Sequence, residues 1–169
     1  MAETHTNTMA EEKNTKNTLS WLSFPSAIGF LTICATDNAL CKLQWGKSPK
    51  PNNESHKILQ PTQKQITAYL ENKLKTFDLP IQFSGTAFQT HVYQALLEIP
   101  YGQHCTYSDL AGKLSSAPRA IGSACGKNPI PIIIPCHRVV GKNGTLTGYS
   151  GGAGNTTKRH LLDLEQKYI

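Results

Sequence analysis

A cysteine, a histidine and an arginine stand directly behind an apolar run in the stretch IIIPCHRVVGKNG, residues 132–144. The thiol of Cys136 could belong to a core residue, a metal ligand, half of a disulfide or a nucleophile. A zinc site needs further ligands at short spacing, and the nearest candidates, Cys105 and Cys125, are isolated. A core position is the usual fate of a free cysteine, but it does not explain the polar neighbours.

A nucleophilic thiol needs a base beside it and a group that orients this base. His137 is the adjacent base, Arg138 adds positive charge, and Glu165 is available on the last segment of the chain. The apolar residues 132–135 would by themselves raise the pKa of the Cys136 thiol, because burial disfavours the thiolate. We expect His137 to offset this desolvation.

Cysteine usage and the N-terminal composition limit the class of protein. The chain has five cysteines and no C-x-x-C pair. An odd count without an export signal argues against a disulfide framework. Residues 1–18 are polar and lack the apolar core of a secretory signal, so we expect a disordered tail there. No apolar run is long enough to span a membrane, and a cytoplasmic location is the default expectation.

The first half of the chain predicts a small sheet and a helix. Residues 19–45 alternate apolar and polar side chains between turn signals, which predicts two or three antiparallel strands. Residues 46–57 are rich in Pro, Asn and Ser and predict a loop. Helical spacing of Ile66, Leu70 and Leu74 predicts a helix over residues 61–77. The extended stretch 78–85 follows, so we place the boundary of an N-terminal domain, residues 19–83, there.

The second half, residues 84–169, predicts a helical domain. A first helix carries an apolar face and ends at the Pro100–Gly102 turn. Thr106 is a candidate N-cap for a short helix, and Pro118 lies near the first turn of another. The exposed positions of that helix are small, which is typical of a helix-turn-helix that approaches a groove closely, or of a helix packed tightly on its own core. A closing helix is expected over residues 155–168.

The net charge of +6 is concentrated in the second half of the chain. Between Tyr101 and His160, seven basic residues stand against Asp109 as the one acid. A basic region attracts polyanions such as nucleic acids, although a solvated surface with lysines for solubility has the same composition. The basic residues are Lys113, Arg119, Lys127, Arg138, Lys142, Lys158 and Arg159.

The stretch NPIPIIIPCHRVVGKNGTLTGYSGG resembles the active-site block of the O6-alkylguanine–DNA alkyltransferases, a family of suicide DNA-repair proteins. The resemblance extends upstream to Gly85 and downstream through LLDLE, about half of the chain. It implies an α+β (α/β) fold. A small N-terminal antiparallel sheet with a helix, ribonuclease H-like, would precede a C-terminal winged helix-turn-helix domain.

The resemblance implies a role for each matching residue. Cys136 would accept the alkyl group, His137 would act as general base through a water, and Glu165 would orient His137. Asn128 would hold the active-site loop by hydrogen bonds, and Tyr107 would protonate the departing guanine.

Further residues would bind DNA and the flipped base. Arg119 would enter the base stack from the minor groove in place of the extruded nucleotide. The resemblance implies DNA contacts from Arg119, Ala120, Gly122, Tyr107 and Ser108, and an alkylguanine pocket formed by Val139, Tyr149, Ser150, Pro131 and Cys125.

The implied reaction is irreversible alkyl transfer from O6-alkylguanine, or from O4-alkylthymine as a second substrate, in duplex DNA. We expect a monomer without a membrane partner that needs no cofactor. Some family members carry zinc in the N-terminal domain, but Cys34, Cys41 and His56 do not complete that ligand set, so no metal is expected. The location would be the cytoplasm, on the nucleoid, or the nucleus in a eukaryote. Two other functions stay open, a non-catalytic lesion-binding module and a cysteine hydrolase.

Overall fold

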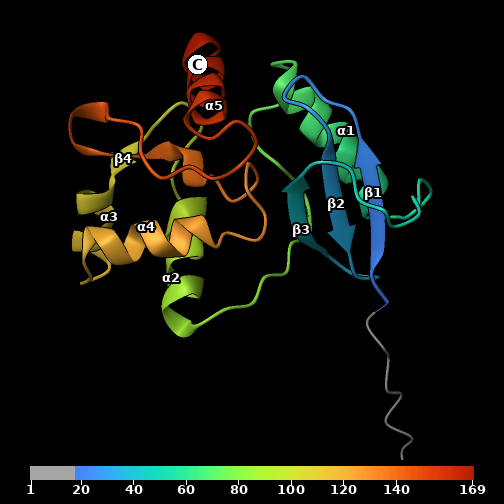
Figure 1. The fold of residues 1–169 in the computed structure, drawn as a ribbon, viewed down its shortest axis with the longest axis horizontal. Helices are drawn as coiled ribbons and strands as arrows, with labels where there is room; N and C mark the ends of the chain where they lie inside the picture. Colours follow the sequence, from blue (N-terminus) through green and yellow to red (C-terminus); the bar gives the residue numbers. More distant parts are fainter. Residues whose placement is uncertain (1–17) are drawn as a thin grey trace, which may run out of the picture.

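The computed structural model describes residues 18–169. The predicted tail lies outside these residues, except for Thr18. Figure 1 shows the three-stranded sheet and helix α1 on one side of the molecule and helices α2 to α5 on the other. No helix within residues 18–169 has the length and apolar character needed to cross a bilayer.

The N-terminal part is an antiparallel sheet covered by one helix, as predicted. Strands β1 (Ser20–Phe24), β2 (Leu31–Ala35) and β3 (Leu40–Trp45) pair in that order. Successive side chains of a strand point to opposite faces. The core face therefore takes alternate residues of β2, namely Leu31, Ile33 and Ala35, and α1 packs against β1 and β2.

Helix α1 (Leu59–Leu70) is shorter at its C-terminal end than the predicted 61–77. The chain leaves the helix at Asn72, which has a φ of 64°. The Asn72 N–H donates to the Tyr69 carbonyl (3.1 Å) and the Lys73 N–H donates to the Ala68 carbonyl (2.8 Å). This pair of bonds satisfies the last helical carbonyls, and asparagine tolerates the left-handed backbone that it requires. The apolar spacing of Leu74 thus continued past the true end of the helix.

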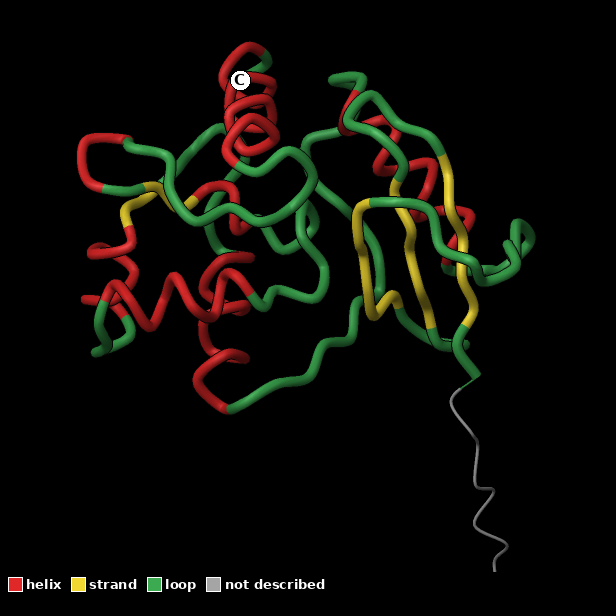
Figure 2. The backbone as a smooth tube through the Cα atoms, viewed as in Figure 1, coloured by secondary structure: helices red, strands yellow, loops and turns green. Residues whose placement is uncertain are grey.

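The C-terminal part contains the predicted helices, with two short strands between them (Figure 2). Thr86 and Thr106 each cap a helix, and both caps are reciprocal capping boxes, with Gln89 and Asp109 respectively. The elements are α2 (Ala87–Leu97), β4 (Cys105–Thr106), α3 (Tyr107–Lys113), α4 (Pro118–Gly126), the 3₁₀ helix η1 (Cys136–Arg138), β5 (Val139–Val140), the 3₁₀ helix η2 (Lys142–Gly144) and α5 (Asn155–Lys167). Strands β4 and β5 pair in parallel.

Strand β3 joins the two parts. Its Leu43 N–H donates to the Pro129 carbonyl at 2.9 Å, just before the loop that carries Cys136. At the end of β3, the Trp45 ring meets the Tyr149 ring edge to face at 6.1 Å. A Cβ at Gly151 would lie 2.6 Å from the Trp45 ring, so this position needs glycine. The sheet therefore fixes both the loop before Cys136 and the loop after it.

Replacement of Thr106 by alanine tests the cap that places Tyr107 on α3. Loss of a threonine N-cap costs about 1 kcal/mol of the free energy of unfolding, and we expect that loss in urea denaturation. Thr67→Ala is the control, because Thr67 lies exposed within α1 and a surface change there shifts stability by about 0.5 kcal/mol or less. Equal stability of the two variants would show that the capping box contributes nothing.

Candidate active site

Cys136 lies at the first position of η1, 5% exposed, at the end of a buried loop. The Asn128 side chain clamps that loop. Its Nδ2 donates to the Ile134 carbonyl (2.8 Å), and its Oδ1 accepts from the Ile130 N–H (3.0 Å). The clamp surrounds Ile132, whose φ of 73° is costly for a β-branched residue. Asn128 thus has the loop-holding geometry that the resemblance implies.

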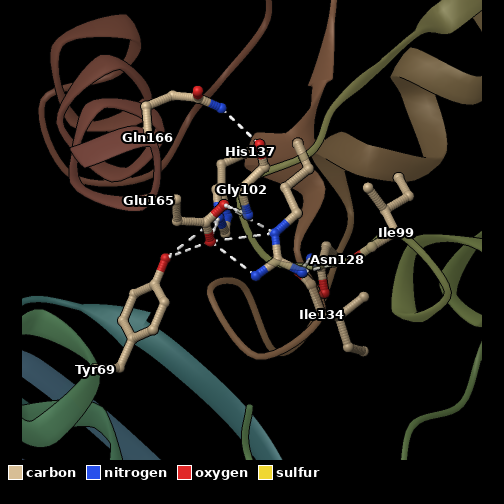
Figure 3. Close-up of polar contacts among 9 residues, drawn as sticks. Tyr69, Ile99, Gly102, Asn128, Ile134, His137, Glu165 and Gln166 are labelled. Atoms are coloured by element: carbon tan, nitrogen blue, oxygen red, sulfur yellow. Dashed lines mark hydrogen bonds and ion pairs between the residues drawn. The ribbon is translucent and has the colours of Figure 1, made fainter. Parts of the chain in front are cut away.

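The Glu165 carboxylate is 1% exposed and collects hydrogen bonds from several parts of the chain (Figure 3). Its Oε1 lies 2.9 Å from His137 Nε2 and accepts from Arg138 Nη2 at 2.8 Å. Burial alone would raise the pKa of this carboxyl. The hydrogen bonds from His137 and Arg138, together with the positive charge of Arg138, outweigh it and hold the pKa at about 2. Glu165 is therefore an anion inside the protein.

His137 is completely buried, and this burial lowers its pKa more than the contact with Glu165 raises it. The imidazole is consequently neutral. A neutral ring beside a carboxylate places its one proton on Nε2, which donates to Glu165. His137 Nδ1 is then a bare lone pair, and among residues 18–169 this buried atom has no hydrogen-bond partner. The ring is ready to accept a proton at Nδ1.

Arg138 does not contribute positive charge to the thiol, contrary to our prediction. Its Nε donates to both carboxylate oxygens of Glu165, at 3.1 and 3.0 Å, and its Nη1 donates to the Ile99 carbonyl at 2.6 Å. The guanidinium also lies over the Tyr101 ring, 5.8 Å from its centroid. Arg138 therefore neutralises the buried carboxylate.

The Cys136 thiol has a raised pKa, because its burial disfavours the thiolate. A hydrogen bond from Asn128 and the positive charge of Lys158 act in the opposite direction. The expected offset of this desolvation by His137 is not found, because the groups that lower the pKa of the thiol are Asn128 and Lys158. The cation near the thiol is Lys158, whose side chain projects from α5 and is 1% exposed.

Tyr107 connects the lysine to the cavity wall. Its hydroxyl accepts from Lys158 Nζ at 3.1 Å and donates to the Thr147 carbonyl at 3.1 Å. Burial and the nearby Cys125 and Cys136 sulfurs raise the pKa of the Tyr107 hydroxyl to about 12. The Tyr107 phenol is therefore a neutral hydrogen-bond donor. If it gave up its proton, the adjacent ammonium of Lys158 would stabilise the phenolate.

A cavity of about 360 Å³ opens in front of the thiol. Four of the five predicted pocket residues line it, but Val139 is instead fully buried in β5, opposite Cys105. Strand β3 supplies one wall, which the sequence did not reveal. The lining includes Leu43, Gln44, Trp45, Tyr107, Cys125, Asn128, Pro131, Cys136, Tyr149, Ser150, Gly151 and Lys158.

The predicted helix-turn-helix is formed by α3 and α4, which pack against each other. Arg119 is exposed at the second position of α4, and Ser108 is exposed on α3. Ala120 and Gly122 are half-buried. A Cβ on Gly122 would meet only the Tyr107 ring, at 4.0 Å. Packing inside the protein therefore does not require glycine at position 122.

The basic surface is smaller than the sequence count indicated. Arg138 and Lys158 are buried, and Lys113 pairs with Glu98 at 2.6 Å. Arg119 remains exposed on α4, and Lys127 is exposed directly after this helix. Lys142 and Arg159 are exposed as well, so the exposed positive charge is not confined to α4.

Two residues of the site escaped the sequence analysis. Lys158 precedes Leu161, Leu162 and Glu165 by three, four and seven positions, which is the spacing of one helix face. The spacing could have marked Lys158 as inward. Tyr69 follows Ile66 by three positions on the buried face of α1. Its hydroxyl donates to Glu165 Oε1 at 2.7 Å and lies 3.4 Å from His137 Nε2.

Comparison with known families agrees with this geometry. Residues 19–83 match the family described as 6-O-methylguanine DNA methyltransferase, ribonuclease-like domain. Residues 87–167 match 6-O-methylguanine DNA methyltransferase, DNA binding domain. The inducible methylated-DNA–protein-cysteine methyltransferase of Bacillus subtilis is 47% identical over 129 residues, which cover 73% of this chain and 71% of that protein.

The chain belongs to this family.

Other members are similar over more of their length. The methylated-DNA–protein-cysteine methyltransferase of Haemophilus influenzae is 39% identical over 157 residues, 88% of this chain and 87% of that protein. A crystal structure of the Mycobacterium tuberculosis O6-methylguanine methyltransferase superposes with a TM-score of 0.80 at 36% identity, covering 90% of this chain and 95% of that one. The M. tuberculosis protein in complex with DNA gives 0.78 at 38% identity, covering 89% and 94%. These structures share both parts of the fold described above.

Tyr69→Phe tests whether the N-terminal part contributes to the site. Loss of the hydroxyl removes one hydrogen bond from the carboxylate that orients His137. Loss of a hydrogen bond to a charged group costs about 1.5–3 kcal/mol, so we expect about a 10-fold slower single-turnover alkyl transfer from a methylated duplex.

Thr62→Val is the matched control. Thr62 is a fully buried hydroxyl on the same helix, but it donates to the Ile58 carbonyl at 2.7 Å and not to Glu165. Equal slowing in both variants would mean that Tyr69 acts only through the stability of α1.

Proposed function

We propose that this protein repairs O6-alkylguanine in duplex DNA by transferring the alkyl group to the sulfur of Cys136, once per molecule. Membership of the 6-O-methylguanine DNA methyltransferase family supports this reaction. The observation that carries it is the placement of the thiol. Cys136 ends a clamped loop at the wall of a cavity, and the neutral His137, held by the Glu165 anion, follows it in the same 3₁₀ helix.

The thiol proton leaves first. His137 Nδ1 accepts it through a bound water, and the resulting imidazolium is stabilised by the Glu165 carboxylate at Nε2. The thiolate then forms beside Lys158 and the Asn128 amide, which favour the anion over the thiol. The resting pair is a neutral thiol and a neutral imidazole, and their ion pair forms in this step.

Alkyl transfer is a displacement at the alkyl carbon. The Cys136 sulfur bonds to that carbon as the carbon–O6 bond breaks, and the guanine leaves with the bond electrons. Tyr107 gives its hydroxyl proton to the departing guanine, for which it must release the Thr147 carbonyl. Lys158 Nζ stabilises the phenolate that is left. A thioether is a poor leaving group, so the protein does not turn over.

The DNA approaches through α3 and α4. A base inside a duplex cannot reach a buried thiol, so the alkylated nucleotide is flipped into the cavity. Arg119 fills the gap in the stack from the minor groove, while Ala120 and Gly122 allow close contact and Tyr107 and Ser108 meet the backbone. Cys125, Pro131, Tyr149 and Ser150, which line the cavity, hold the base.

We extend the proposal to the domains, the oligomeric state, the location and a second substrate. We assign residues 19–83 and 84–169 to an N-terminal and a C-terminal domain, and we propose a monomer that acts in the cytoplasm on the nucleoid, or in the nucleus of a eukaryote. O4-alkylthymine is a second substrate class. The exposed Arg119 supports this function over that of a cysteine hydrolase, and the thiol of Cys136 supports it over that of a lesion-binding module.

The direct test is to incubate the protein with an O6-methylguanine duplex and to map the methyl group by peptide mass spectrometry. We expect stoichiometric methylation of Cys136 and no turnover. Bound duplex with an unmodified Cys136 peptide would identify a lesion-binding module. Repeated turnover on an ester or amide, with no salt-dependent DNA binding, would identify a hydrolase.

Arg119→Ala tests the route of the base into the cavity. Repair of duplex DNA should fall by about 100-fold, because unstacking costs a few kcal/mol that Arg119 no longer offsets. Reaction with the free modified base should change little. Lys142→Ala, an exposed charge change away from α4, is the control. Equal losses on both substrates in Arg119→Ala would contradict the stacking role.

A further inference from the structure

Two cysteines outside the acceptor site face each other across the β2–β3 hairpin. Cys41 Sγ lies 3.8 Å from Cys34 Sγ and 3.3 Å from the Cys34 carbonyl oxygen. Both thiols are free. Among residues 18–169, no other pair of cysteine sulfurs lies in such contact. The alkyl-transfer chemistry described above uses neither residue.

A β-bulge brings these two side chains together. Cys34 pairs with Lys42, whereas the next residue, Ala35, pairs with Leu40, so Cys41 is the extra residue of β3. In a bulge, two residues of one strand oppose one residue of the other. Cys41 and Lys42 therefore both oppose Cys34, at the separation of neighbouring strands that a disulfide requires.

The pair lies on the face of the sheet away from the core. Ile33 and Ala35 belong to the core, and Cys34 between them points to the opposite face. There it lies opposite Trp21 on the neighbouring strand. Lys42 Nζ lies over the Trp21 ring, 6.0 Å from its centroid. Cys34 is 1% exposed, whereas Cys41 is partly open to solvent. A small oxidant can thus reach Cys41 first, with Cys34 held behind it.

We propose that Cys34 and Cys41 form an oxidisable dithiol site, which a peroxide converts into an intrachain disulfide while the acceptor Cys136 stays reduced. The Cys41 sulfur attacks one peroxide oxygen, which gives a sulfenic acid, and the leaving hydroxide combines with the Cys41 thiol proton as water. The Cys34 sulfur then attacks the Cys41 sulfur, and the Cys34 proton leaves with the hydroxyl as water. Two thiols lose two electrons in total, and one peroxide is reduced to two waters.

The order of these steps follows from the environment of each thiol. Burial raises the pKa of Cys34 to about 12, and the charge and hydrogen bond of Cys41 add to this effect. Cys34 is therefore the resolving thiol, because it stays protonated while Cys41 reacts. The resulting bond would lock the bulge and stabilise the hairpin whose far end, Trp45, lines the acceptor cavity.

The test treats the reduced full-length protein with hydrogen peroxide, blocks the remaining thiols and digests it with trypsin. Residues 17–42 form one tryptic peptide that contains both cysteines. We expect this peptide to lose two hydrogens and to take up no blocking reagent. Cys136 should still accept a methyl group from a methylated duplex, and the oxidised protein should unfold at higher urea than the reduced one.

Two variants separate the site from general oxidation. Cys34→Ser should leave Cys41 as a sulfenic or higher acid, without a disulfide. Cys105→Ser, a change at a partly exposed cysteine elsewhere, should leave the disulfide yield unchanged. A reduced 17–42 peptide after the peroxide is consumed, or a disulfide that includes Cys136, would overturn the proposal. The wild-type protein decides the matter even if a variant fails to fold.

Discussion

The Glu165 carboxylate is an anion in the interior of the protein, and the site depends on how it is held there. Removing a charge from water costs several kcal/mol unless hydrogen bonds and an opposite charge offset this cost. Arg138 supplies the opposite charge, and Tyr69, His137 and the Gly102 N–H (3.4 Å) supply further donors. These groups come from α1, from the turn after α2 and from η1. Their meeting point therefore fixes the two parts of the fold against each other.

This arrangement divides the electrostatic tasks between two cations. Arg138 neutralises the carboxylate, so the field of Glu165 reaches the thiol only weakly. Lys158 lines the same cavity as Cys136 and Tyr107, and it favours the negative charge that appears on sulfur and on the phenol oxygen. A neutral His137 lies at the carboxylate side and accepts the proton. The Cys136 thiol and the His137 imidazole can thus remain neutral at rest and become a thiolate and an imidazolium during the reaction.

The local part of this structure could be predicted from the sequence, because caps, turns and apolar spacing are local signals. Thr106 and Pro118 marked helix starts correctly, and the three strands followed their alternation. The family resemblance also implied that Cys136, His137 and Glu165 belong to one site, and His137 does contact Glu165 in the structure. The end of α1 was missed, since the spacing of Leu74 outweighed the turn signal of Asn72. Both the apolar spacing of Leu74 and the turn residue Asn72 lie within a few residues of the observed end of α1 at Leu70.

The contacts between distant elements could not be predicted in the same way. Tyr69 and Glu165 are separated by 96 positions, and the sequence around either residue does not predict its contact with the other. Lys158 counted as surface charge until the packing of α5 placed it inside. The position of Arg138 two residues after Cys136 indicated a contact with the thiol, but the guanidinium instead binds the Glu165 carboxylate. The partner of a buried polar residue depends on the tertiary fold, which composition and periodicity do not describe.

The protonation of His137 in the intact protein tests the central claim most directly. The two imidazole nitrogens can be followed by NMR of ¹⁵N-labelled protein as the pH falls through about 6.5, the ordinary pKa of histidine. Because burial lowers the pKa of His137, we expect a neutral ring with its proton on Nε2 and a bare Nδ1, and this state should persist below that pH. An imidazolium at neutral pH, or a proton on Nδ1, would contradict the assignment of His137 as the base for Cys136.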